Sequence, residues 1–189
     1  MLQKFVKNFM KMVRHKSDLW LGIDPGNVKS GYVVFDKDEW KIVDCNIVGN
    51  YYLQQVILER YANKCKLVIE KISSYGMRVG NTVFDTVYWT GRFAEKWYSL
   101  TYEEPYFLTR KEVVRILCMS VKANDADVRQ AIIDMFPPIG EGKIPQIGTK
   151  KKKGPLYGLK KDMWQALALI LAKLEEEYGI KRVYSKTQS

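Results

Sequence analysis

The chain has 189 residues, 47% of them hydrophobic and 28% charged, a composition typical of one globular domain with a sizeable core. Thirty-one Lys and Arg residues outnumber 21 Asp and Glu residues, which gives a formal net charge of +10. This excess favours a polyanionic partner, nucleic acid ahead of an anionic membrane, although a basic surface can also serve solubility alone. No apolar run approaches the roughly 20 residues that span a bilayer, so we expect no membrane partner.

Residue types that serve nucleophilic catalysis or zinc binding are scarce. The cysteines at 45, 65 and 118 are far apart and form no Cys-x-x-Cys pair, which is typical of reduced thiols in the cytoplasm. The only histidine is His15, which disfavours a histidine-dependent triad or a histidine-rich zinc site. If the chain is an enzyme, carboxylates with a bound metal are the expected machinery.

Residues 1–18 are expected to form an extension, followed by a single domain over residues 19–189. The extension carries apolar residues at helical spacing with lysines between them, which predicts a cationic amphipathic helix, and it shows no cleavage site of a secretory signal. Such a helix can lie on DNA, on a partner subunit or on a membrane surface, or it can pack on the domain itself.

The first part of the domain predicts strands and one helix. Leu19–Asp24 reads as a buried strand that ends at a turn, and Gly31–Phe35 and Trp40–Val48 are β-rich runs joined by a polar turn. A helix over Tyr51–Lys64 and a short strand over Lys66–Glu70 follow. An antiparallel meander followed by a helix and a further strand favours an α/β fold with a mixed sheet.

The second part predicts mainly helices. They are expected over Asn81–Ser99, after a capping box at Thr109 and Glu112, over Asp125–Phe136 with Asn124 as the N-cap, and from about Lys161, with a brief strand over Pro105–Leu108. The expected core face of the first of these helices comprises Val83, Phe84, Val87, Gly91, Ala94 and Tyr98. The expected core stripe of the last comprises Met163, Leu167, Ile170, Leu171, Leu174 and Tyr178. Residues 137–161, rich in Gly, Pro and Lys, predict a long, basic, mobile loop.

Three acids occupy positions suited to catalysis. Asp24 and Glu70 end two predicted strands, and Asp162 lies in the first turn of the last helix. If the two strands are neighbours, Asp24 and Glu70 converge at one edge of the sheet, and the helix can supply Asp162 from the side. Three clustered carboxylates repel one another unless cations neutralise them, which implies bound Mg²⁺ or Mn²⁺. Two such ions about 3.5–4 Å apart can activate water and stabilise the leaving oxygen in phosphodiester cleavage.

Each acid also has a plain structural explanation. Asp-Pro-Gly is common turn chemistry, Glu70 can be a surface residue at a strand end, and Asp162 favours the positive end of a helix dipole. Together, in a basic protein without other catalytic residue types, the three acids favour the metal site.

Three motifs resemble the RuvC family of Holliday junction resolvases. They are Gly22-Ile23-Asp24-Pro25-Gly26 with Gly31, then Val68-Ile69-Glu70, then Asp162-Met163-Trp164-Gln165-Ala166-Leu167-Ala168. The phage-type branch is also similar around Asn124–Ala131 and Gly154–Gly158, so that the resemblance covers about residues 21–172. It implies an RNase H-like fold with a five-stranded mixed sheet, a homodimer, and paired Mg²⁺-dependent nicks across a four-way DNA junction.

The resemblance places Asp24, Glu70 and Asp162 on catalytic acids of the family, which implies two Mg²⁺ ions per subunit with Mn²⁺ as a substitute. Bacterial members carry a further acid three residues after the position of Asp162, where this chain has Gln165. Metal binding by the last helix is then weaker, or another group such as Asp125 completes the site. The same departure favours a broader choice of branched DNA, including forks and flaps.

Candidate substrate contacts lie in two loops. The bacterial relatives carry a stacking aromatic residue in the loop after the second acid, and here Tyr75 is expected to stack on a base and Arg78 to meet a phosphate. The run Lys150, Lys151, Lys152 and Lys153 is expected to meet backbone phosphates, with a solvated loop as the alternative.

The sequence therefore favours a metal-dependent, structure-selective DNA endonuclease. A catalytically weakened branched-DNA-binding protein of the same fold is the first alternative, with Gln165 as its main support. An actin-like phosphotransferase that uses the turn at Asp24 is the second, but the chain lacks a Walker-type motif and is too short for the two domains of that class.

Overall fold

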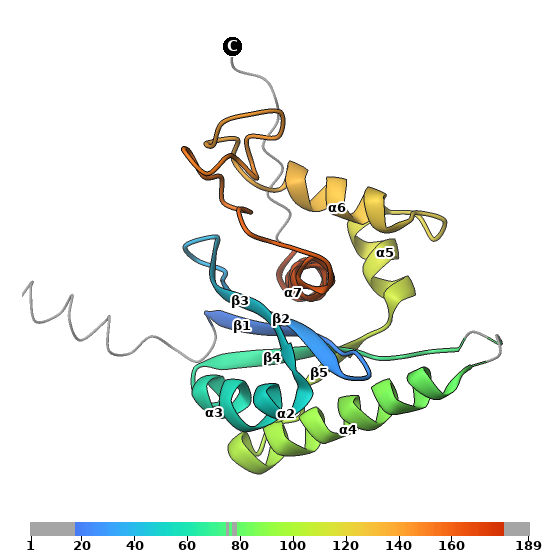
Figure 1. Cartoon of the computed structure of the whole chain (residues 1–189). Helices are drawn as coiled ribbons and strands as arrows, with labels where there is room; N and C mark the ends of the chain where they lie inside the picture. Colours follow the sequence, from blue (N-terminus) through green and yellow to red (C-terminus); the bar gives the residue numbers. More distant parts are fainter. Residues whose placement is uncertain (1–17, 75, 77–78, 180–189) are drawn as a thin grey trace, which may run out of the picture.

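The computed structural model describes residues 18–74, 76 and 79–179, so the expected amphipathic extension lies outside the described residues. Five strands form one sheet in the order β3-β2-β1-β4-β5 (Figure 1). They are β1 (Leu19–Asp24), β2 (Lys29–Asp36), β3 (Lys41–Gly49), β4 (Cys65–Glu70) and β5 (Tyr106–Leu108). The first three strands are antiparallel, whereas β4 is parallel to β1 and β5 is parallel to β4. The predicted mixed five-stranded sheet of an α/β fold is confirmed.

Helices cover both faces of this sheet (Figure 1). They are α2 (Asn50–Tyr52), the π-helical η1 (Leu53–Ile57), α3 (Leu58–Tyr61), α4 (Asn81–Thr101), α5 (Arg110–Cys118), α6 (Asp125–Asp134) and α7 (Asp162–Tyr178). The segments α2, η1 and α3 follow one another directly, so the helix predicted after the meander is one helical stretch with a widened middle turn. This stretch and α4 lie on one face, and α5, α6 and α7 lie on the other.

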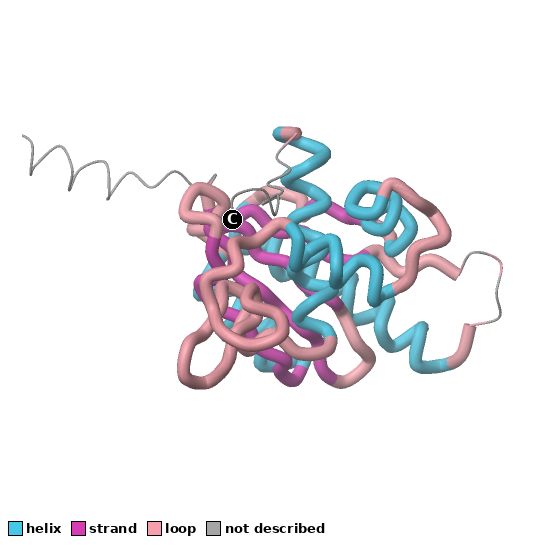
Figure 2. The backbone as a smooth tube through the Cα atoms, turned by 90° about the horizontal axis from the view of Figure 1, so that it is seen from above, coloured by secondary structure: helices cyan, strands magenta, loops and turns pink. Residues whose placement is uncertain are grey.

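The alternation of side chains along the strands divides the core in two. In β1, Trp20 packs with the layer of α5, α6 and α7, whereas Leu21 and Ile23 pack with the layer of α2, η1, α3 and α4. Seen from above, helices overlie the strands (Figure 2). Among the described residues, no helix is long and apolar enough to cross a membrane.

The core face predicted for α4 is wrong except at Ala94, which is partly buried and packs against the core. Phe84, Val87 and Tyr98 are exposed, with relative accessibilities of 61%, 49% and 42%. The residues that α4 buries are Trp89, Thr90, Phe93 and Trp97. The helix carries two neighbouring apolar stripes, and the aromatic stripe with i, i+4, i+8 spacing offers the larger area to bury. The other stripe is left on the surface.

The expected mobile loop over residues 137–161 is instead folded on itself. The amide of Gly140 donates to the carbonyl of Pro145 at 2.9 Å, and the amide of Leu156 donates to the carbonyl of Gln146 at 2.9 Å. A Cβ on Gly154 would lie 2.2 Å from the Gln146 carbonyl oxygen, so only glycine permits this close approach. Leu156 is fully buried in the core and anchors the loop to the domain.

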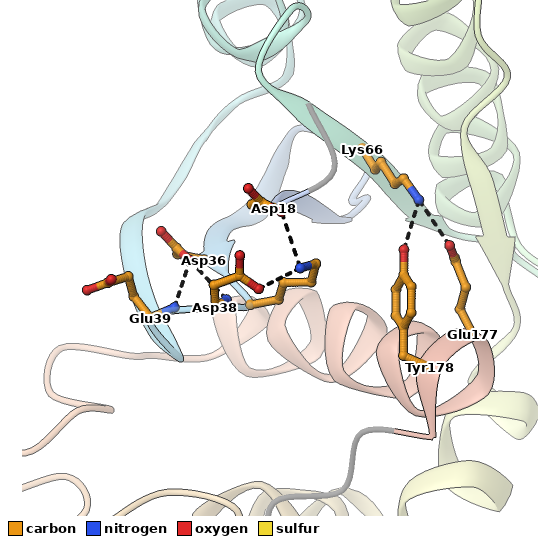
Figure 3. A network of polar contacts seen from close by, with 8 residues as sticks. Asp18, Asp36, Asp38, Glu39, Lys66, Glu177 and Tyr178 are labelled. Atoms are coloured by element: carbon orange, nitrogen blue, oxygen red, sulfur yellow. Dashed lines mark hydrogen bonds and ion pairs between the residues drawn. The ribbon is translucent and has the colours of Figure 1, made fainter. Parts of the chain in front are cut away.

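Polar contacts fasten the ends of β1 and α7 that lie away from Asp24 and Asp162 (Figure 3). The ammonium of Lys37 lies 3.2 Å from the Asp18 carboxylate at the start of β1. Lys66 of β4 donates to Glu177 at 2.9 Å and to the hydroxyl of Tyr178 at 3.0 Å at the end of α7. Tyr178, which was expected in the core stripe, therefore has an exposed ring and a polar role.

Candidate active site at the carboxyl ends of β1 and β4

Asp24 and Glu70 lie side by side because of the register of two parallel strands. Ile23 of β1 pairs with Ile69 of β4, and Asp24 and Glu70 are the next residues of the two strands. Both carboxylates therefore emerge at the same edge of the sheet. Each is held at the end of a strand whose preceding residues are fully buried, which fixes the backbone beneath it.

Two glycines of the sheet place Asp162 beside this pair. Gly31 pairs with Asp24 across β1 and β2, and a Cβ on Gly31 would lie 2.7 Å from the Cβ of Asp162. A Cβ on Gly22 would lie 2.2 Å from the carbonyl oxygen of Ala166, one turn further along α7. The missing side chains let the first turns of α7 rest directly on β1 and β2. The structure thus brings the three predicted acids together.

Burial and neighbouring acids raise the pKa of Asp24 to about 9. Burial is the largest cause, followed by the negative charge of Glu70 and a hydrogen bond with it, and then by the charge of Asp162. The positive charge of Arg110 acts in the opposite direction. A cation bound beside Asp24 would stabilise the charged form of this carboxyl, which burial and the neighbouring acids disfavour.

The three acids fit Mg²⁺ by the chemistry of their donors. Carboxylate oxygens are the hard ligands that Mg²⁺ and Mn²⁺ prefer, and Mg²⁺ keeps several water molecules while it uses only one or two carboxylates and a substrate phosphate. Within the described part of the chain, no group of three or more His, Cys, Asp or Glu side chains is arranged to hold a metal ion by itself. A metal bound at the three acids would need further ligands from substrate and water.

Arg110 is the residue at this edge that the sequence analysis missed. Its Nη1 donates to Oε1 of Gln165 at 2.6 Å, and its Nη2 forms an ion pair with Asp125. Asp125 thus contacts Arg110, and its side chain is 73% exposed, rather than turned in among the acids. The sequence shows only that Arg110 follows a predicted capping residue, Thr109; the pairing of Leu108 with Glu70, which places Arg110 at this edge, comes from the structure.

The candidate DNA contacts are placed in part. Tyr75 and Arg78 lie outside the described residues. The four lysines at 150–153 are exposed on the folded loop that leads into α7, where Thr149 closes a tight turn by accepting from the amide of Lys152 at 3.2 Å. The ammonium of Lys153 lies 4.9 Å from the ring centroid of Tyr157. These lysines are therefore carried by a defined turn.

Neither a protein-family model nor a curated protein matches the sequence. Solved structures do match the fold. The structure of RuvC from Thermus thermophilus superposes with a TM-score of 0.59 at 14% identity over 87% of this chain and 99% of that chain. The chain has a RuvC-like fold.

A second match is T. thermophilus RuvC in complex with a Holliday junction substrate, with a TM-score of 0.58 at 15% identity over 87% of this chain and 98% of that chain. At this level of identity the comparison establishes the RuvC-like fold, an RNase H-like architecture.

Proposed function

We propose that this RuvC-like protein is a metal-dependent, structure-selective DNA endonuclease that resolves Holliday junctions by paired nicks. The observation that carries the proposal is the convergence of Asp24 and Glu70 at one sheet edge, with Asp162 brought beside them over Gly31. The formal net charge of +10 favours binding of a polyanion such as DNA.

In the proposed mechanism, the carboxylates of Asp24, Glu70 and Asp162 would hold the metal ions. When bound, two Mg²⁺ or Mn²⁺ ions supply activation of the attacking water and stabilisation of the departing 3′ oxygen. The buried strand ends beneath Asp24 and Glu70 keep these carboxylates in place, so that little reorganisation is needed when substrate arrives.

The proposed substrate is branched DNA, with four-way junctions first and forks and flaps as further substrates. The exposed turn of Lys150–Lys153 continues into the helix that carries Asp162, so phosphate contacts there would lie on the same segment as a catalytic acid. Tyr75 and Arg78 are proposed to contact a base and a phosphate. We place the activity in the cytoplasm, that of a bacterial host if the protein is of phage origin.

Paired nicks require two active sites, and we propose that a homodimer supplies them. The outer stripe of α4 exposes Phe84, Val87 and Tyr88, with relative accessibilities of 61%, 49% and 59%. A groove along the same helix is lined by Val87, Tyr88, Gly91 and Arg92. An apolar stripe of this kind is suited to a second copy of the chain.

The substitution Asp24→Asn tests the proposed function. It keeps the shape of the side chain but removes the charge needed for metal binding, so Mg²⁺-dependent nicking of a synthetic four-way junction should fall below detection. Junction binding, measured without metal in a gel-shift assay, should remain within about threefold of wild type. Full nicking by the Asp24→Asn protein would exclude this site.

The contact between Gln165 and Arg110 also supports a second candidate, a branched-DNA-binding protein with a weakened site. In this interpretation Gln165 replaces the further acid of the last helix, and it accepts a hydrogen bond from Arg110. The positive charge of Arg110 near Asp24 would then weaken metal binding. Calorimetry distinguishes the two candidates. Absence of Mn²⁺ binding together with tight junction binding by the wild type would favour the weakened protein.

A further inference from the structure

Arg110 stands at the edge of the sheet where the acids converge. It is the first residue of α5, and Thr109 before it closes a capping box with Glu112, so the start of the helix is fixed. Leu108, two residues earlier, pairs with Glu70 across β5 and β4. The positive charge of the guanidinium is close enough to Asp24 to act against the rise in the pKa of that carboxyl, which burial, Glu70 and Asp162 cause.

The guanidinium is held from two further helices. Gln165, on the turn of α7 that follows Asp162, accepts one hydrogen bond, and Asp125 at the start of α6 accepts another. The Arg110 side chain is only 28% exposed, which limits its freedom. A guanidinium carries five N–H donors, so these two contacts do not exhaust its capacity to bind an anion.

If Arg110 served only to link α5 to α6 and α7, its guanidinium would not need to lie beside the three acids. Asp125 is 73% exposed, and an exposed ion pair contributes little to stability. Gln165 accepts from Arg110 through a neutral amide, so it orients the guanidinium without cancelling its charge. Asp125 is also paired with the guanidinium, but its carboxylate is exposed and its charge is screened by solvent. The arrangement therefore fixes the guanidinium next to the site that is proposed to bind phosphate.

We propose that Arg110 is a catalytic residue of this nuclease and that its guanidinium, positioned by Gln165 and Asp125, donates hydrogen bonds to the scissile phosphate. This inference rests on the proposed function. Gln165 is then a positioning residue of the arginine rather than a lost metal ligand.

The chemistry of the step explains the need for this charge. The water oxygen forms a bond to phosphorus and the P–O3′ bond breaks, while the nonbridging oxygens carry extra negative charge in the transition state. The attacking water loses its proton to solvent, and the 3′ oxygen takes up a proton. Fixed donors aimed at developing charge are among the largest contributors to catalysis.

The test compares Arg110→Ala with Arg115→Ala, which removes the same charge from an exposed position on the same helix. Three quantities are measured on the full chain: the single-turnover nicking rate on a four-way junction, the junction Kd without metal, and the Kd of the protein for Mn²⁺. Melting curves confirm that both variants are folded.

For Arg110→Ala we expect a nicking rate about 10²–10³-fold lower, as for other lost transition-state donors. The junction Kd should change by less than about fivefold, and Mn²⁺ should bind as tightly or more tightly, because a like charge near the carboxylates is gone. Arg115→Ala should nick at close to the wild-type rate. Gln165→Ala should slow nicking in the wild type but add nothing in the Arg110→Ala background, because it acts through Arg110.

An Arg110→Ala protein that nicks within about threefold of wild type would overturn the inference. A rate loss matched by an equal loss of Mn²⁺ affinity would also overturn it, since Arg110 would then act only by arranging metal ligands. If the wild type itself nicks no branched DNA, the proposed function fails. If the wild type and the Arg110→Ala protein are equally active, only the inference about Arg110 fails.

Discussion

At the scale of single residues, Asp24 of the proposed active site lowers the stability of the metal-free protein at neutral and alkaline pH. Its carboxyl is largely buried beside Glu70, with the charge of Asp162 nearby, and both burial and repulsion disfavour its charged form. A pKa raised to about 9 in the folded protein means that the contribution of Asp24 to stability is present below pH ~4 and is lost as the pH rises toward 9. The metal-free protein is therefore strained by the residue that its proposed chemistry needs.

Asp24→Asn should accordingly stabilise the metal-free protein. In EDTA we expect the Tm of the variant to exceed that of wild type by several degrees at pH 8 and by less at pH 5, since about 1 kcal/mol shifts the Tm of a chain of this size by roughly 2–4 °C. Mn²⁺ should raise the Tm of wild type but not of the variant. A variant that is less stable than wild type at pH 8 would contradict this account.

Gly31 matters because a helix rests on it. A Cβ at this position would lie 2.7 Å from both the carbonyl carbon and the Cβ of Asp162, and these atoms belong to the first turn of α7. Gly31→Ala should displace that turn, destabilise the fold by about 1–3 kcal/mol, and lower the nicking rate. Gly49→Ala is the control, because nothing lies within 4 Å of a Cβ there. Equal effects of the two substitutions, by denaturant melts and nicking rates, would exclude this packing role.

At the scale of elements, some features were readable in the sequence and others were not. The capping box at Thr109 and the N-cap at Asn124 are local patterns, and the structure confirms both; Asn124 also forms a capping box with Asp127, which was not predicted. The buried face of α4 depends on which of two apolar stripes meets the sheet, a choice made by packing between distant segments. The position of Arg110 beside the acids was not predicted for the same reason. Its hydrogen-bond partners lie on α6 and α7, and only the fold brings them together.

The exposed stripe of α4 makes a prediction about assembly. Val87→Glu places a charge at the centre of the proposed dimer surface and should shift the protein from dimer to monomer in sedimentation velocity experiments. Val43→Glu on β3 is a matched control, since Val43 is 48% exposed and Val87 is 49% exposed. The monomer should lose paired nicking while keeping its Tm. A wild type that is monomeric at micromolar concentration would remove the basis of this prediction.

At the scale of the whole molecule, the basic charge and the folded loop over residues 137–161 should act together in binding DNA. Replacement of the four lysines at 150–153 by glutamine removes up to four phosphate contacts, so the slope of log K against log salt should become shallower by up to about 3–4. The fold should be unaffected, because Leu156 anchors the loop and the lysines are exposed. An unchanged salt slope would show that the turn faces solvent only.

The overall fold was largely predictable because its signals are distributed along the chain. Alternating β-rich runs, a helix and a second strand ending in an acid predicted the mixed sheet, and the register of Ile23 with Ile69 then brings Asp24 and Glu70 together as expected. The sequence also predicted the place of Asp162 at the start of the last helix. Contacts between side chains of separate helices, such as the hydrogen bond from Arg110 to Gln165, cannot be predicted from such patterns.

We propose that the edge formed by Asp24, Glu70 and Asp162 cleaves junctions with a bound metal. Cleavage of a plasmid that extrudes a cruciform tests it most directly, with and without Mg²⁺. We predict symmetrically placed nicks in opposing strands that require Mg²⁺ and disappear in the Asp24→Asn protein. An intact cruciform with Mg²⁺ present, or nicks that persist in EDTA, would contradict the account.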